Sequence, residues 1–173
     1  TLTEGKPSFE RVVAMPGLSE DEVLRLAASL DQGSEHPLAD AIVQAARAKG
    51  LALDKPEDFE SGSGIGVRGR VAGRQLALGN TVLMEQVGVS ADPLLAQAEA
   101  LRATGASVMY LAADGQLQGL LAVSDAVKAS TPEALANLHA AGLRIVMATG
   151  DGMTTAKAVG AKLGIDEVHG EVK

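Results

Sequence analysis

Three short motifs carry groups that could bind a phosphate or a nucleotide. The first, Thr149-Gly150-Asp151, follows an apolar run at 143–148 and precedes a helical pattern. Ligands of open α/β sheets bind beyond the carboxyl ends of the strands, where a helix N-terminus offers free N–H groups to an anion. A Thr hydroxyl can donate to a phosphoryl oxygen, and an Asp can hold a water or a cation's hydration shell. The alternative is that Thr149 or Asp151 only caps the helix.

The second motif is a glycine-rich run, Gly62-Ser63-Gly64-Ile65-Gly66. From Gly64 to Gly69 its spacing matches the dinucleotide fingerprint, which needs a strand before it and a helix after it. A charged stretch at 54–58 precedes the run and a β-type segment follows, so the fingerprint is rejected on context. Two interpretations remain: glycines that let backbone approach a ligand, or a flexible start to a hairpin.

The third motif, Glu35-His36-Pro37, precedes a second helical pattern. A neutral imidazole can stack on an adenine ring, and a carboxylate can accept a hydrogen bond from the exocyclic amine. A His at this place is also commonly a plain surface or capping residue. His139 and His169 have no partners among their sequence neighbours, and three dispersed His without Cys predict no metal site.

Composition limits the remaining classes of function. The net charge of −7, with no basic run, argues against binding to nucleic acid. Hydrophobic residues make up 46% of the 173 residues, enough for a packed core. The chain has no Cys, which excludes disulfides and thiolate chemistry. No run approaches 18 apolar residues, so the sequence predicts a soluble piece, and the missing initiator Met suggests an excised fragment.

The pattern of elements changes near Val123. Before it we expect short helices among antiparallel strands: strands at 9–15, 67–71, 74–78, 107–113 and 116–123, and helices at 20–30, 37–50, 80–87 and 92–104. After it, a helix from Thr131 to about Gly142, a strand of the buried parallel type at 143–148, a helix through Leu163 and a strand at 167–169 indicate β-α-β order.

Taken together and in this order, the motifs resemble those of the heavy-metal-transporting P-type ATPases along essentially the whole chain. The family's phosphorylation motif reads D-K-T-G-T-L-T, and this chain opens on Thr1-Leu2-Thr3. Four further motifs match the family's S-E-H-P, G-x-G, G-N and T-G-D signatures: Ser34-Glu35-His36-Pro37, Gly62 to Gly66, Gly79-Asn80 and Thr149-Gly150-Asp151. Asp125-Ala126-Val127-Lys128 resembles its D-P-x-K/R step, with Ala in place of Pro.

The resemblance implies a fold of mixed α/β and α+β class with three segments. Residues 1–5 and 122–173 would belong to a partial Rossmann-like phosphorylation domain of the haloacid dehalogenase type. Residues 6–121 would form an inserted nucleotide-binding domain, an antiparallel sheet flanked by helices, and the two crossings would act as a hinge.

The same resemblance implies the site. ATP would be bound by Glu35, His36, Gly62, Gly64, Ile65, Gly66, Gly79 and Asn80, and phosphate by Thr149, Gly150 and Asp151. Either Gly62 and Gly64 or Gly64 and Gly66 could be the family's glycine pair.

A parent pump is implied as well. It would use ATP and Mg²⁺ to form an aspartyl phosphate that drives a metal cation, with copper(I) as our choice, across a plasma or inner membrane. Its actuator domain and membrane helices would be the partners of this cytoplasmic, monomeric piece. The phosphorylated Asp would precede Thr1, so we expect ATP binding without hydrolysis. The alternatives are a nucleotide-free regulatory or scaffolding domain, and a haloacid dehalogenase-type phosphatase.

Overall fold

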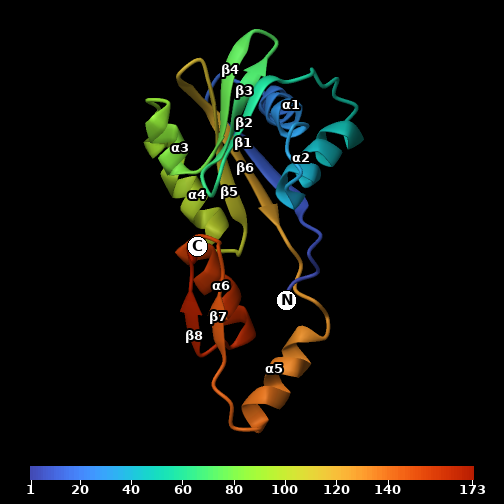
Figure 1. The fold of residues 1–173 in the computed structure, drawn as a ribbon, viewed down its shortest axis with the longest axis vertical. Coiled ribbons are helices and arrows are strands. Elements are labelled where there is room, and N and C mark those ends of the chain that lie inside the picture. Colours follow the sequence, from blue (N-terminus) through green and yellow to red (C-terminus); the bar gives the residue numbers. More distant parts are fainter.

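Six antiparallel strands form one sheet at the centre of the larger part of the molecule (Figure 1). The computed structural model describes residues 1–173, and the strand order is β1-β6-β5-β4-β3-β2. The strands are β1 (Ser8–Ala14), β2 (Glu57–Gly62), β3 (Gly66–Val71), β4 (Arg74–Gly79), β5 (Ser107–Ala113) and β6 (Gln116–Ser124). Positive φ angles at Asp114 and Gly115 give the β5–β6 turn the twist that a two-residue hairpin needs, as the sequence predicted.

Helices cover both faces of this sheet. On one face lie α1 (Glu20–Asp31) and α2 (Pro37–Ala48). On the other lie α3 (Thr81–Gln86), the short 3₁₀ helix η1 (Asp92–Leu94) and α4 (Leu95–Arg102). An apolar cluster fills each space, with Leu30 and Ile42 on the first side and Met84 and Tyr110 on the second. We call residues 8–124 the six-stranded module.

The rest of the chain forms a smaller parallel α/β unit. It contains α5 (Thr131–Ala140), β7 (Val146–Ala148), α6 (Met153–Leu163) and β8 (Glu167–His169). Strands β7 and β8 pair in parallel, so the predicted change from antiparallel to parallel order after Val123 is confirmed. We call residues 131–173 the two-stranded module. No helix in the structure combines the length and apolar character that crossing a bilayer requires.

One connection, residues 125–130, joins the modules, and the N-terminal segment 1–7 runs beside it; we call these the two crossing segments. Thr3 bridges Val127, and the Asp125 carboxylate accepts hydrogen bonds from the N–H groups of Gly5 at 3.1 Å and Lys6 at 3.2 Å. This Asp125 clasp holds the two crossing segments side by side.

Three expected elements differ from the structure. Strand β2 was not predicted, because Glu57, Asp58 and Glu60 give it no apolar alternation; it forms by pairing with β3. The helix expected at 92–104 begins as a separate 3₁₀ turn and ends at Arg102. The predicted buried strand at 143–148 shortens to Val146–Ala148, and the Val146 side chain is 53% exposed because only β8 pairs with it.

Candidate functional site

The glycine run forms the turn between β2 and β3 and is pressed against the end of β4. Gly66 lies opposite Gly79, and a Cβ added to Gly79 would fall 2.1 Å from the Ile65 carbonyl oxygen. A Cβ added to Gly66 would fall 2.3 Å from the Leu78 carbonyl oxygen, and its φ of 133° is itself a glycine conformation. The backbones of β3 and β4 approach so closely here that neither Gly66 nor Gly79 leaves room for a side chain.

Asn80 fixes this turn to the start of α3. Its Oδ1 accepts from the N–H of Leu83 at 3.2 Å, which caps α3, and its Nδ2 donates to the Gly64 carbonyl at 2.9 Å. Its own N–H donates to the Ile65 carbonyl at 3.0 Å. The side chain that sequence reasoning placed beside a nucleotide therefore also holds the turn in shape.

The backbone separates the two possible glycine pairs. Gly64 has a φ of 73° and faces open space, so it exposes its backbone in a conformation that favours glycine. Gly62 has no such φ, and the nearest neighbour of a Cβ there would be the Ile65 side chain, 2.6 Å away. Backbone conformation thus demands glycine at positions 64 and 66, whereas the demand at Gly62 is steric.

His36 is the N-cap of α2. Its Nδ1 accepts from the N–H of Leu38 at 3.1 Å, and Pro37 takes the first helical position. The neutral ring then carries its proton on Nε2, which has no partner in the chain. The capping interpretation is confirmed, and the ring, exposed at the surface, keeps its Nε2 without a partner.

Asp31 is a candidate that sequence reasoning missed. It is the last residue of α1, only 4% exposed, and its Oδ2 has no hydrogen-bond partner. Burial raises the pKa of its carboxyl to about 7. A carboxylate is also disfavoured at a helix C-terminus, so nothing local stabilises it there. The sequence gives no signal that singles it out, because α1 also carries charged side chains at Glu20, Asp21, Glu22 and Arg25.

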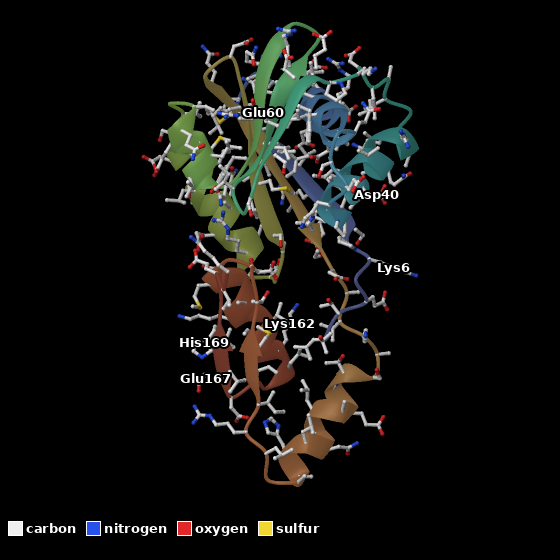
Figure 2. The ribbon with its side chains drawn as sticks, viewed as in Figure 1. Lys6, Asp40, Glu60, Lys162, Glu167 and His169 are labelled. Carbon is white, nitrogen blue, oxygen red and sulfur yellow. The ribbon has the colours of Figure 1, made fainter.

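Asp31 and Glu35 line the same hollow of about 430 Å³, together with Ser34 and three residues of α2, Asp40, Val43 and Arg47. Figure 2 labels Asp40 at the side of the six-stranded module where α2 lies. The loop between α1 and α2 is held in place by Gly33, where a Cβ would lie 2.6 Å from the Phe59 ring of β2. This hollow is mostly polar and open to solvent.

The predicted nucleotide residues fall into two groups. Gly64, Gly66, Gly79 and Asn80 contact one another directly, while Glu35 shares its hollow with Asp31. No hydrogen bond joins the groups; Phe59, three residues before Gly62, packs against Gly33 between them. Figure 1 shows the β2–β3 turn and the start of α2 towards the same end of the sheet, the end nearer α6.

The third motif lies apart, at the end of β7. Thr149 Oγ1 accepts from the Asp151 N–H at 3.2 Å, and neither side chain caps α6, whose N-cap is Gly152. The capping alternative is therefore wrong. The N–H groups of Gly150 and Gly152 have no partner in the chain, so they remain free for an anion at the helix N-terminus.

The other two histidines do have partners, contrary to expectation. His139 Nε2 lies 2.8 Å from Asp166 Oδ2, and His169 Nε2 lies 2.6 Å from Glu167 Oε1. The Ile145 N–H, and after it His139, hold the pKa of Asp166 below its usual value. The first contact connects α5 to the residue before β8, the second lies within β8, and both give the histidines a structural role. No group of three or more His, Cys, Asp or Glu is arranged to hold a metal ion.

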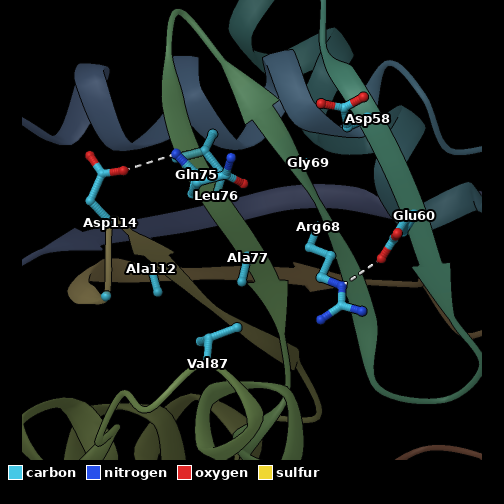
Figure 3. A pocket seen from close by; sticks show the side chains of 11 residues that line it. Asp58, Glu60, Arg68, Gly69, Gln75, Leu76, Ala77, Val87, Ala112 and Asp114 are labelled. Carbon is cyan, nitrogen blue, oxygen red and sulfur yellow. Dashed lines mark hydrogen bonds and ion pairs between the residues drawn. The ribbon is translucent and has the colours of Figure 1, made fainter.

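A larger hollow of about 600 Å³ lies on the α3 side of the sheet, away from all predicted site residues (Figure 3). Its floor is made of small residues, Ala77 and Ala112. Its charged rim is mostly paired: Arg68 Nε donates to Glu60 at 2.8 Å, and Asp114 accepts from the Gln75 N–H at 2.9 Å. Paired rim charges leave no orphaned group that a ligand would satisfy.

Comparison with known proteins places this geometry in a family. All of residues 1–173 match the haloacid dehalogenase-like hydrolase family. The chain is 47% identical over 169 residues to the silver exporting P-type ATPase of Salmonella typhimurium, covering 98% of this chain and 20% of that protein. It is 49% identical over 172 residues to the copper-exporting P-type ATPase of Legionella pneumophila, covering 99% and 23%. The chain thus spans about a fifth of the length of these relatives.

Solved structures agree with the sequence relatives. A zinc-transporting PIB-type ATPase in an E2·Pi state matches with a TM-score of 0.72 and 31% identity, over 99% of this chain and 28% of that one. The N-domain of HMA6, a copper-transporting P-type ATPase, matches with a TM-score of 0.59 and 31% identity, over 69% of this chain and 99% of that one. The chain therefore belongs to the haloacid dehalogenase-like hydrolases and, within them, to the heavy-metal-transporting P-type ATPases.

Proposed function

We propose that this chain binds ATP in its six-stranded module and holds part of the phosphate site in its two-stranded module. Glu35 and His36 would contact the adenine, and the turn around Gly62, Gly64, Ile65 and Gly66 would let the nucleotide approach backbone. Gly79 and Asn80 would hold that turn open to the ligand. Thr149, Gly150 and Asp151 would bind the phosphate group that is transferred, without being phosphorylated themselves.

The observation that carries this proposal is the unpaired carboxyl oxygen of Asp31. A buried polar atom without a partner costs roughly 1–3 kcal/mol, and such atoms in folded proteins call for an explanation. An exocyclic amine is a donor that this oxygen could accept from, and Glu35 lines the same hollow. We therefore add Asp31 to the residues proposed to read the adenine.

The phosphate end is supported by the free donors of the loop. The unpaired N–H groups of Gly150 and Gly152, beside the Thr149 hydroxyl, suit a phosphoryl group. Mg²⁺ usually arrives with phosphate oxygens and needs only one or two carboxylates from protein, and the exposed Asp151 could supply one. When bound, the ion would neutralise phosphate charge during transfer.

We infer that the parent protein couples ATP hydrolysis, through an aspartyl phosphate, to the export of a metal cation, with copper(I) as the proposed cargo. The relatives are described as exporters of copper and of silver, which supports a soft monovalent cation. In that parent, residues 1–5 and 122–173 would belong to the phosphorylation domain and 6–121 to the nucleotide domain. The actuator domain and the membrane helices would be its partners.

Titration of the 173-residue chain with ATP tests the proposal. We expect amide resonances of Glu35, His36, Gly64 and Asn80 to shift together with one saturating midpoint, and no ADP to accumulate. A regulatory or scaffolding domain of the same fold would show no shifts at these positions, and that result would contradict nucleotide binding. The same titration with GTP shows whether the base is read.

Substitution of His36 separates its two roles. His36→Asn keeps a good helix cap but removes the ring, whereas His36→Gln also weakens the cap, at about 1 kcal/mol. We expect both variants to lose ATP affinity several-fold while staying folded, with His36→Asn the more stable of the two. Calorimetric titration and thermal melts measure these effects. An unchanged affinity in both variants would remove His36 from the site.

A further inference from the structure

The modules touch at a second place, far from the two crossing segments. Figure 1 shows the crossing segments on one side of the molecule and α6 beneath α4 on the other. There the Thr155 hydroxyl, which is buried, donates to the Ala106 carbonyl at 2.7 Å. The Lys162 ammonium donates to the Thr104 carbonyl at 3.2 Å. Because this contact and the crossing segments lie on opposite sides, a swing about the Asp125 clasp must open or close the contact.

Glu99 of α4 forms the contact nearest the phosphate loop. Its Oε2 accepts from the Thr154 hydroxyl at 3.1 Å, in the first turn of α6. Its other oxygen accepts from Arg102 at 2.8 Å, and the Arg102 guanidinium lies 5.8 Å from the centre of the buried Tyr110 ring. The hydrogen bond from Arg102 is the main cause that holds the pKa of Glu99 below its ordinary value, so the side chain is charged at neutral pH.

The contact between α4 and α6 is mostly polar, as in domain interfaces that can separate. Apart from Val159 of α6, which would lie 3.4 Å from a Cβ on Gly105, its contacts are hydrogen bonds: the one between Thr155 and Ala106 is buried, and those of Glu99 and Lys162 are exposed. Polar contacts between domains are typical of surfaces that separate and rejoin. The Glu99 charge also lies at the positive end of α6, where it interacts favourably with the helix dipole.

We propose that α4 and α6 form a releasable latch between the modules, in which Glu99 and an anion bound at Thr149–Asp151 oppose one another. Both negative charges would be near the first turn of α6. Each would therefore weaken the interaction of the other with this end of the helix. Phosphate arriving at the loop would loosen the latch, and a closed latch would lower affinity for phosphate. The opposition rests on the phosphate site proposed above; the latch itself does not.

The chain lacks Cys, so two introduced cysteines can carry spin labels without background. Gln44→Cys on α2 and Ala161→Cys on α6 are exposed, and neither residue takes part in the hydrogen bonds of the latch. We expect a narrow distance distribution in the parent chain and a broader, shifted one after Glu99→Gln with Lys162→Ala. Glu133→Gln, on the exposed face of α5, is the matched control. An unchanged distribution in the double variant would overturn the latch.

Inorganic phosphate tests the opposition of charges. We expect the Glu99→Gln chain to bind phosphate about two- to five-fold more tightly than the parent chain, read from the Gly150 and Gly152 amide shifts. Equal midpoints in the two chains would overturn the opposition. Absence of any shift in either chain would contradict the proposed phosphate site, and the opposition with it, while the distances still decide the latch.

Discussion

Gly79→Ala is expected to lower the unfolding free energy by about 3 kcal/mol or more and to abolish nucleotide binding. The added methyl would lie 2.1 Å from the Ile65 carbonyl oxygen and 2.9 Å from the Gly66 Cα. Both neighbours are backbone, so relief requires β3 and β4 to separate where they carry the β2–β3 turn. Overpacking of this kind costs typically 1–3 kcal/mol even where side chains can adjust. Urea unfolding and an ATP titration measure the two effects.

Gly73→Ala is the matched control in the same sheet. Gly73 has a φ of 78° but nothing within 4 Å of an added Cβ, so it bears conformational strain without a clash. We expect a cost of about 1 kcal/mol and unchanged ATP affinity. If Gly79→Ala proved no more costly than this, the close backbone contact with Ile65 would not be a feature of the molecule in solution.

Asp31→Asn is expected to move stability and ATP affinity in opposite directions. Burial raises the Asp31 pKa from 3.8 to about 7, so the folded chain holds this proton more tightly than the unfolded chain. The resulting stability is present in full below about pH 4, declines as the pH rises and is lost above pH 7. The variant has no such loss. Relative to the parent chain, its unfolding free energy should therefore rise by about 2–4 kcal/mol between pH 4 and pH 8.

At pH 8 the same variant should bind ATP roughly 10–100-fold more weakly, because a charged acceptor for the adenine amine is lost. Asp40→Asn alters an exposed carboxylate of the same hollow and serves as control, with neither effect expected. A gain in stability without loss of affinity would mean that Asp31 is buried for some other reason. Chemical denaturation at the two pH values and calorimetry at pH 8 distinguish these results.

Local rules account for what the sequence predicted well. Ser19 caps α1, Pro37 starts α2 and Asp114-Gly115 closes a hairpin; each is decided by residues within four positions of one another. Strand β2 follows no local rule. This acidic segment pairs with β3 as a strand, and Arg68 and Arg70 of β3 form ion pairs with its Glu60 and Glu57, at 2.8 Å and 2.7 Å.

The sequence indicated the residues of the site through short motifs, but it did not indicate how those motifs come together. The Gly64–Asn80 hydrogen bond and the close approach of Gly66 and Gly79 span 16 and 13 residues, and only the pairing of β3 with β4 brings them together. Asp31 could not be singled out, because its isolation depends on how α1 and α2 pack. The His139–Asp166 pair, 27 residues apart, depends likewise on the position of β8.

The Asp125 clasp has a consequence for how the chain could be cut and joined. Its bonds to Gly5 and Lys6 close a loop of about 120 residues, and Ser8 is the pairing partner of Ser124, so the six-stranded module begins and ends at neighbouring points. Loop-closure entropy grows only slowly with length, so a host fold accepts such a long insertion at little more cost than a short one. A segment with adjacent ends is also portable: excised near Lys6 and Asp125, or spliced into another surface turn, it should keep its own core.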